Sequence, residues 1–312
     1  MTEARLDDAA RAGWLYYVAG NTQDEIARKL GVSRQSAQRL VAMAVSERLI
    51  KVRLDHPIAR CMELAQRLTD RFGLIRCEVV PSDPDAPGLL TGLAIAGAAE
   101  MERHLKAAEP RILALGTGRA LRACTEQLPR MACPQHRIVS RLGNMMEDGE
   151  ATPYNVAVRM AERVGAQHYP MPLPVLARSA SELSVLHAQT AVRNTLDLCA
   201  RADATFVGIG QIDAEAPLVI DGFMTRAEAA ALAGQGAVGE ITSWVFDAEG
   251  RVLAGGYNAR VASAPLDRAG EAPVIGLGLG AAKVPAIRGA LIGGLVNGIV
   301  TDEATAESVL AG

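Results

Sequence analysis

The chain is organised around the segment Thr22-Gln-Asp-Glu-Ile-Ala-Arg-Lys-Leu-Gly-Val-Ser-Arg-Gln-Ser-Ala-Gln-Arg-Leu-Val-Ala-Met43. Thr22 is followed three residues later by Glu25, and this spacing predicts a capping box at the start of a short helix. Gly31 predicts the end of that helix, because glycine adopts the left-handed conformation without steric cost. Ser33 then suits the N-cap of a second helix. Two capped helices joined by a tight turn predict a helix-turn-helix, whose second helix enters the major groove of DNA.

The outward face of the second predicted helix carries side chains that suit DNA binding. Arginine can bridge two acceptors on guanine, glutamine can pair with adenine, and hydroxyl groups can hold phosphate. The alternative is an ordinary helical hairpin whose polar face is only solvated. The predicted DNA-binding residues of the two helices are Thr22, Gln23, Ser33, Arg34, Gln35, Ser36, Gln38 and Arg39.

Segments on both sides of this motif complete a predicted DNA-binding domain over residues 1–55. A helix before the motif packs on it in this interpretation, with Trp14 and Tyr17 as core aromatic residues. Residues 46–54 alternate apolar and charged side chains, which predicts a short strand that forms a wing beside the helices. Lys51 and Arg53 on that strand are further candidates for phosphate contacts.

Length and composition indicate two domains with a large apolar core. The chain has 312 residues, of which 49% are hydrophobic and 21% are charged. The net charge of −3 hides an asymmetry, since residues 1–60 hold 10 Lys/Arg and 7 Asp/Glu, whereas residues 61–312 hold 22 and 28. A basic N-terminal part on an acidic remainder predicts that only the N-terminal part meets the DNA phosphates.

Cysteine and histidine usage argues against a disulfide framework and against a zinc site. The five cysteines are scattered without a C-x-x-C pair, and the five histidines show no H-E-x-x-H spacing. No basic and apolar leader opens the chain, and the apolar tract 286–300 is interrupted by Arg288, several glycines and Asn297. We therefore expect a cytoplasmic protein without a membrane span.

From residue 74 onward, short β-type runs alternate with helical stretches. Strands are predicted over residues 74–80, 111–115, 137–141, 167–170, 205–209, 240–246 and 274–279. Helices are predicted over residues 89–107, 119–127, 153–164, 184–201, 226–233, 284–295 and 302–310. This alternation predicts parallel strands joined by right-handed crossovers, and hence a doubly wound, Rossmann-like α/β domain over residues 74–312. A connecting helix over residues 56–73 would join the two domains and could also pair subunits.

Three predicted strand ends carry glycine-rich turns of the kind at which α/β domains bind ligands. Backbone N–H groups at such turns can approach an anion or a hydroxyl closely, and neighbouring side chains add donors and acceptors. Two further polar residues follow apolar strands and are candidate hydroxyl partners. The alternatives are tight turns without a ligand, a solvated lysine, and polar residues that only cap turns. The candidate effector-binding residues are Gly116, Thr117, Gly118, Arg119, Asn144, Gly210, Gln211, Asp213, Asp247 and Lys283.

The sequence lacks the common motifs of catalysis. It contains no G-x-S-x-G and no P-loop, and Leu121 occupies the place of the last glycine in a G-x-G-x-x-G fingerprint. We therefore predict a protein that is not an enzyme and that binds a small effector but no cofactor. Two alternatives stay open: an enzyme with a DNA-binding head, which the resemblance described below would make an enzyme of the sugar-phosphate isomerase or deaminase type, and a structural DNA-binding protein without an effector.

The end of the chain carries a specific pattern, Lys283-Val-Pro-Ala-Ile-Arg-Gly-Ala-Leu-Ile-Gly-Gly-Leu-Val-Asn-Gly-Ile-Val-Thr-Asp-Glu-Ala-Thr-Ala306. Together with the Gly116–Arg119 turn and the segment 239–250, this pattern resembles the SorC family of sugar-responsive bacterial transcriptional regulators, sometimes grouped with DeoR-type regulators. The resemblance extends over nearly the full length. Segments 148–155 and 169–174 look like the branch of the family that is associated with polyol catabolism.

The resemblance implies a helix-turn-helix joined to an effector domain related to sugar-phosphate isomerases and deaminases. It also implies a homo-oligomer, dimer or tetramer, and an effector that weakens or alters operator binding. One departure concerns Ala120, which stands where many members have a Thr or Ser that helps to hold a phosphate. From the resemblance as a whole we expect a repressor of a carbohydrate or polyol operon, controlled by a small sugar, a polyol or a sugar phosphate.

Overall fold

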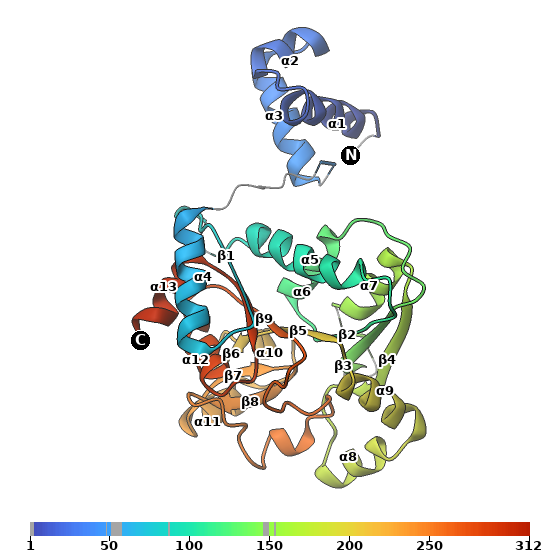
Figure 1. The fold of residues 1–312 in the computed structure, drawn as a ribbon, viewed down its shortest axis with the longest axis vertical. Helices are drawn as coiled ribbons and strands as arrows, with labels where there is room; N and C mark the ends of the chain where they lie inside the picture. Colours follow the sequence, from blue (N-terminus) through green and yellow to red (C-terminus); the bar gives the residue numbers. More distant parts are fainter. Residues whose placement is uncertain (1–2, 48, 51–57, 87, 146–149, 153) are drawn as a thin grey trace. The chain divides into compact units, whose positions relative to one another are not determined.

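The computed structural model describes residues 3–47, 49–50, 58–86, 88–145, 150–152 and 154–312. By its internal contacts the chain divides into two compact units, Met1–Pro57 and Ile58–Gly312 (Figure 1). The described part of the first unit is helical, and all of the described strands belong to the second unit.

Three helices form the described part of the first unit: α1 (Glu3–Tyr17), α2 (Gln23–Leu30) and α3 (Arg34–Ser46). The capping box of α2 is present, because the Glu25 N–H donates to Thr22 Oγ1 and the Thr22 N–H donates to Glu25 Oε2. Gly31 ends α2 in the left-handed conformation, with a φ of 67°. Ser33 Oγ accepts from the backbone N–H of Ser36 and so begins α3. The local signals therefore produce the predicted order of helix, turn and helix.

A small apolar core joins these three helices. Ile26 of α2 and Ala37 of α3 are fully buried, and both belong to one cluster with Ala12 of α1. Burial of this apolar stripe, more than helix propensity, stabilises helices as short as α2.

The prediction that Trp14 and Tyr17 are core residues is wrong. Their exposed fractions are 55% and 44%. The contact between α1 and α3 is made by small residues instead, because a Cβ atom on Gly13 would lie 2.6 Å from the Cβ of Ala44. Helices that approach this closely leave no room between them for aromatic rings.

The predicted wing strand lies mostly outside the described residues. Ser46 belongs to α3, and Lys51 and Arg53 fall within residues 51–57, which the structure does not describe. The predicted phosphate contacts of these two cations therefore stay predictions.

A seven-stranded parallel sheet forms the centre of the second unit. Its order is β1-β10-β9-β5-β2-β3-β4, and every pair of neighbours in it is parallel. The strands are β1 (Arg76–Val80), β2 (Ile112–Leu115), β3 (Arg137–Met145), β4 (Gln167–Pro174), β5 (Ala204–Gly208), β9 (Val274–Leu277) and β10 (Gly298–Asp302). The predicted α/β class with parallel strands is confirmed.

Helices cover both faces of this sheet (Figure 1). On one face lie α5 (Thr91–Leu105), α6 (Arg119–Gln127) and α7 (Val156–Val164), and on the other α4 (Ala59–Phe72), α9 (Thr190–Ala200), α12 (Val284–Ile292) and α13 (Glu303–Ala311). The strands alternate accordingly: Leu113 and Leu115 of β2 belong to the core under α6, whereas Ala114 belongs to the core under α9. A strand buried on both faces reads as a continuous apolar run, which explains the run at 112–115.

A small antiparallel sheet is attached beside the large one. It consists of β6 (Gly210–Gln211), β7 (Ala237–Ile241) and β8 (Trp244–Asp247). The prediction of a single strand over 240–246 is therefore wrong, because the chain reverses at Thr242 and Ser243. The short helices α10 (Pro217–Ile220) and α11 (Arg226–Gly234) and the 3-10 turns η1 (Asn258–Arg260) and η2 (Ala281–Lys283) complete this region.

Two other expectations need correction. The helix predicted over 184–201 is two helices, α8 (Ala180–His187) and α9, because the extended backbone at Gln189 lets α9 pack on the sheet while α8 buries none of its residues fully. Strand β10 has no counterpart in the predicted strands. Its five residues lie between two helical segments, and only pairing with β1 and β9 makes them a strand.

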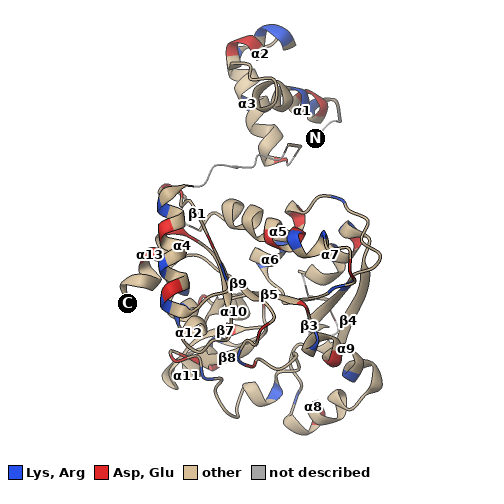
Figure 2. Cartoon of the chain, viewed as in Figure 1, with Lys and Arg blue, Asp and Glu red and all other residues tan. Residues whose placement is uncertain are grey.

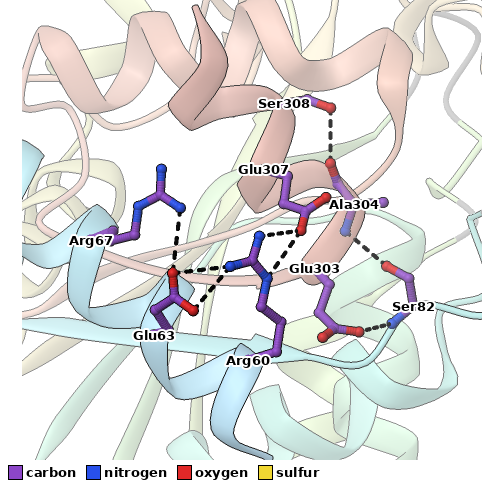
Figure 3. A network of polar contacts seen from close by, with 8 residues as sticks. All are labelled: Arg60, Glu63, Arg67, Ser82, Glu303, Ala304, Glu307 and Ser308. Carbon is purple, nitrogen blue, oxygen red and sulfur yellow. Dashed lines mark hydrogen bonds and ion pairs between the residues drawn. The ribbon is translucent and has the colours of Figure 1, made fainter.

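Helix α4 is built into the second unit and is not a free connection between domains. Leu64 and Leu68 are buried in the core that also contains residues of α12 and α13. At the first turn of α4, the Arg60 guanidinium lies 3.0 Å from Glu63 and 2.7 Å from Glu307 of α13 (Figure 3). The helix predicted as a separate connection over residues 56–73 therefore packs, in its described part, as a helix of the second unit.

Candidate functional site

The strand order of the parallel sheet reverses between β2 and β5. Strands β3 and β4 continue from β2 on one side, and β9, β10 and β1 continue from β5 on the other. Open α/β sheets bind ligands at the carboxyl ends of the strands beside such a switch point. A cavity of about 230 Å³ is lined by the turns that follow both strands. By the same measure one water needs about 10–15 Å³, so the cavity has room for a small molecule.

The cavity combines an apolar wall with a few convergent polar groups. Leu90, Leu142, Leu218, Phe223 and Leu277 contribute to the wall. This combination is typical of sites that bind small molecules. The polar and charged lining residues are Thr117, Arg119, Tyr154, Asp221, Glu240, Thr242, Ser243 and Lys283.

Two positions at this site require glycine for different reasons. A Cβ atom on Gly210 would lie 2.2 Å from Glu240 Oε1, so no larger residue fits here without displacing the glutamate. Gly118 has a φ of 112°, which residues with a side chain rarely adopt. This conformation brings the chain from β2 into the N-terminus of α6 at Arg119.

Arg119, Asp221 and Tyr154 form a polar cluster on one side of the cavity. Arg119 Nη2 lies 3.0 Å from Asp221 Oδ1, and the Tyr154 hydroxyl donates to both oxygens of Asp221 at 2.9 and 3.1 Å. Burial raises the pKa of Tyr154, and the hydrogen bond to Asp221 acts in the same direction. Tyr154 therefore stays a neutral donor, and Asp221 keeps two partners.

Glu240 and Lys283 carry the other two charges of the cavity lining. Burial raises the pKa of Glu240, while the backbone N–H of Ser243 and the charge of Lys283 act in the opposite direction. Burial lowers the pKa of Lys283, and the charge of Glu240 opposes that effect. Each group thus favours the charged form of the other.

The turn between β7 and β8 holds two residues in an unusual conformation. Thr242 and Ser243 have φ values of 50° and 71°, so both central residues of this two-residue turn lie in the left-handed region, as a type I′ hairpin requires. Such a turn normally contains Asn and Gly, and positive φ is a true outlier for a β-branched residue such as threonine. Both side chains are buried. The Thr242 hydroxyl has no hydrogen-bond partner among the described residues, and the Ser243 hydroxyl lies near that of Tyr257.

The structure brings most of the predicted effector-binding residues together. Thr117, Gly118, Arg119, Gly210 and Lys283 line the cavity. Gly116 and Asn144 line a smaller pocket of about 20 Å³, which shares Thr117 with the cavity.

Three of the predicted effector-binding residues lie elsewhere. Asp213 Oδ1 accepts from the backbone N–H of Glu215, and Asp247 accepts from the N–H groups of Glu249 and Arg251 and from Arg251 Nε. These are turn-capping contacts, and neither aspartate lines either of the two pockets. Gln211 lies on β6 and also lines neither pocket. An effector contact by these residues stays a prediction.

Sequence reasoning missed Tyr154, Asp221, Glu240, Thr242 and Ser243. They come from separate segments, and no spacing in the sequence connects them. The hairpin had one available signal, since two apolar runs are separated by the polar pair Thr242-Ser243. That pair is not among the usual type I′ turn sequences, so the signal was weak.

The predicted DNA-binding face is exposed on α3. Arg34, Gln35, Gln38 and Arg39 are all exposed, whereas the Thr22 and Ser33 hydroxyls are engaged in capping. Acidic and basic residues are mixed on α1 and α2 (Figure 2). The polar face of α3, rather than a uniform basic surface, therefore carries the DNA-binding prediction.

The described residues offer no group of three or more His, Cys, Asp or Glu side chains that could hold a metal ion. The five cysteines are free thiols, and burial raises the pKa of Cys124 to about 12. No helix in the described part of the chain is long and apolar enough to cross a membrane.

Comparison with known proteins identifies the second unit. The Sugar-bind family model, which describes a sugar-binding domain, matches residues 56–311. The erythritol catabolism regulatory protein EryD of Brucella abortus is 37% identical over 310 residues, covering 99% of this chain and 98% of that protein. The transcriptional regulator LsrR of Klebsiella pneumoniae is 31% identical, covering 97% of this chain and 92% of that protein. These relatives are named as regulators, in agreement with the prediction of a protein that is not an enzyme.

Solved structures share the fold. The full-length sorbitol operon regulator SorC from Klebsiella pneumoniae superposes with a TM-score of 0.68 at 23% identity, covering 99% of this chain and all of that one. A DeoR family regulator from Listeria monocytogenes gives a TM-score of 0.71 at 20% identity over 80% of this chain and 99% of that one. The chain therefore belongs to the SorC-like family of transcriptional regulators with a sugar-binding domain.

Proposed function

We propose that the protein represses a carbohydrate or polyol catabolic operon and is released from its operator by a small sugar, polyol or sugar phosphate. The observation that carries the effector part is the cavity at the β2/β5 switch point, in a unit matched by a sugar-binding family. Hydroxyl-rich ligands need many donors and acceptors on an apolar wall, which the lining supplies. The absence of Thr or Ser at position 120 removes one phosphate donor.

The first unit is the DNA-binding domain in this proposal. Helices α2 and α3 act as a helix-turn-helix, and Arg34, Gln35, Gln38 and Arg39 reach base edges or phosphates. Such regulators read repeated half-sites as homo-oligomers, so we expect a dimer or tetramer that works in the cytoplasm. A relation of the second unit to sugar-phosphate isomerases is part of the same proposal.

Effector binding must favour one arrangement of the oligomer over another. A ligand shifts an equilibrium only by its difference in affinity for the two states. Helix α4 comes after residues 51–57, which the structure does not describe, and an ion pair between Arg60 and Glu307 joins it to α13. We propose that a change in this part of the second unit alters the spacing of the DNA-reading helices.

A DNA-binding titration tests the proposal. Fluorescence anisotropy of the full chain on the DNA upstream of its own operon is measured with and without a panel of polyols, sugars and their phosphates. Erythritol is the first probe, because one relative is named for erythritol catabolism. We expect specific binding that one class of effector weakens by at least about tenfold.

The outcomes separate the two halves of the proposal. Failure to bind the upstream DNA at low salt would refute the operator assignment. Operator binding that no member of the panel changes would refute control by a carbohydrate effector.

A further inference from the structure

The charges that line the cavity cancel one another. Among the lining residues that the structure describes, Arg119 and Lys283 are cations and Asp221 and Glu240 are carboxylates. With all four of these groups ionised, the lining carries no net charge. It therefore gives a dianion no overall electrostatic gain over a neutral molecule.

Arg119 already has a carboxylate partner, since its guanidinium lies 3.0 Å from Asp221. A phosphate that took this cation would have to displace the carboxylate or lie beside it. Glu240 and Lys283 both line the cavity, so a phosphate bound by Lys283 would share the cavity with the Glu240 carboxyl group. Like charges placed next to each other in a binding site are strongly unfavourable.

The hydroxyl of Thr242 is an unsatisfied group of the lining. Thr242 and Ser243 are 6% and 1% exposed; among the described residues the Thr242 hydroxyl has no partner, whereas the Ser243 hydroxyl lies near that of Tyr257. A buried polar group without a partner is costly, and a backbone outlier persists where the site needs it. A ligand hydroxyl can both donate to and accept from such groups, and so removes this cost.

One feature favours an anion. The N-terminus of α6 begins at Arg119 behind the Gly116-Thr117-Gly118 turn, and helix N-termini attract phosphate. Ala120 in the first turn adds no hydroxyl donor, and Asp221 already holds the arginine that starts the helix. The carboxylate next to this helix end offsets its attraction for a dianion.

We infer that the effector is a neutral polyhydroxy compound, a short polyol or free sugar, and not its phosphate ester. This inference rests on the proposed effector site at the switch point and narrows the class of ligand. The charged groups of the lining orient the ligand hydroxyls by donating to them or accepting from them. The Thr242-Ser243 turn forms hydrogen bonds with further hydroxyls of the same ligand. Asp221 acts as the residue that rejects phosphate.

Isothermal titration calorimetry of the full chain tests this inference with matched ligand pairs. Each pair consists of a polyol of four, five or six carbons and its terminal monophosphate. We expect the neutral member of the best-bound pair to bind at least about tenfold more tightly. In Asp221→Asn, which keeps an acceptor for Tyr154 but frees Arg119, the ratio should shift towards the phosphate by about tenfold or more.

Asp70→Asn is the matched control, because it makes the same chemical change at an exposed position of α4 outside the cavity. Its ratio should equal that of the wild type. Tighter binding of the phosphate by the wild-type chain would overturn the inference while leaving the proposed regulator intact. An unchanged ratio in folded Asp221→Asn would overturn the role of Asp221.

Absence of binding across all pairs would remove both this inference and the proposed carbohydrate effector. The wild-type comparison needs no variant, so it decides the ligand class even if Asp221→Asn does not fold.

Discussion

Replacing the strained turn by its preferred sequence, Thr242→Asn together with Ser243→Gly, should stabilise the protein and weaken its effector binding. Both positions have positive φ, and this turn type favours Asn followed by Gly. The backbone hydrogen bond from residue 243 to Glu240 needs only the N–H group, so the double variant retains it.

The expected gain follows from a short balance of free energies. A left-handed conformation costs a residue with a side chain roughly 1–2 kcal/mol, and the variant relieves this cost at both positions. Two effects oppose this gain. The glycine destabilises the folded state by about 0.5–1 kcal/mol, because it raises the entropy of the unfolded chain, and the loss of the buried threonine methyl group costs about 0.8 kcal/mol. The net stabilisation is about 1–2 kcal/mol, which raises Tm by about 2–8 °C in a domain of this size.

Thermal unfolding without ligand measures the first effect, and calorimetric titration with the best effector measures the second. Loss of two hydroxyl partners should weaken binding by about 30-fold, since each net hydrogen bond contributes about 1 kcal/mol. Thr242→Ser is the control, because it keeps the hydroxyl and should keep the affinity. A Tm at or below that of the wild type would refute the strain argument, and unchanged affinity would refute the role of the hydroxyls.

Three further predictions concern the other parts of the molecule. Arg34→Ala should weaken operator binding by about 1–3 kcal/mol and leave effector affinity unchanged; equal anisotropy titrations of variant and wild type would disprove its place in the interface. Gly210→Ala should lower stability by about 1–3 kcal/mol, because its Cβ would lie 2.2 Å from a carboxylate oxygen on β7. Gly270→Ala is the control and should leave stability unchanged, because nothing lies within 4 Å of its Cβ position. Equal denaturation midpoints for Gly210→Ala and Gly270→Ala would count against the close packing at Gly210. Asp247→Asn should lower Tm at pH 7. Burial tends to raise the pKa of Asp247, but the hydrogen bonds and the charge of Arg251 outweigh burial, so the pKa of Asp247 is lowered in the folded state. A carboxylate with a lowered folded pKa stabilises the folded protein above about pH 4, the ordinary aspartate range, and this stabilisation is lost as the pH falls through the folded pKa. The Tm values of variant and wild type should therefore converge in acid. Values that stay apart would contradict this reasoning.

Local signals were sufficient to predict the helices of the first unit. The capping box at Thr22, the left-handed Gly31 and the cap at Ser33 all involve partners within four residues, so the sequence contains them directly. The exposure of Trp14 was not predictable in this way. It depends on how closely α1 approaches α3, and that distance is set by Gly13 and its neighbours in space.

The sequence by itself determined the alternation of strands and helices, and with it the parallel α/β class and the glycine-rich turn at Gly116–Arg119. Strand order, which creates the switch point between β2 and β5, came only from the tertiary structure. The same is true of the cluster of Arg119, Tyr154 and Asp221. In the sequence, Tyr154 follows Arg119 by 35 residues and Asp221 follows Tyr154 by 67 residues. Periodicity records which face of an element is buried, but not which distant element covers it. Tertiary structure therefore decided which predicted residues share the cavity, and it left Asp247 outside.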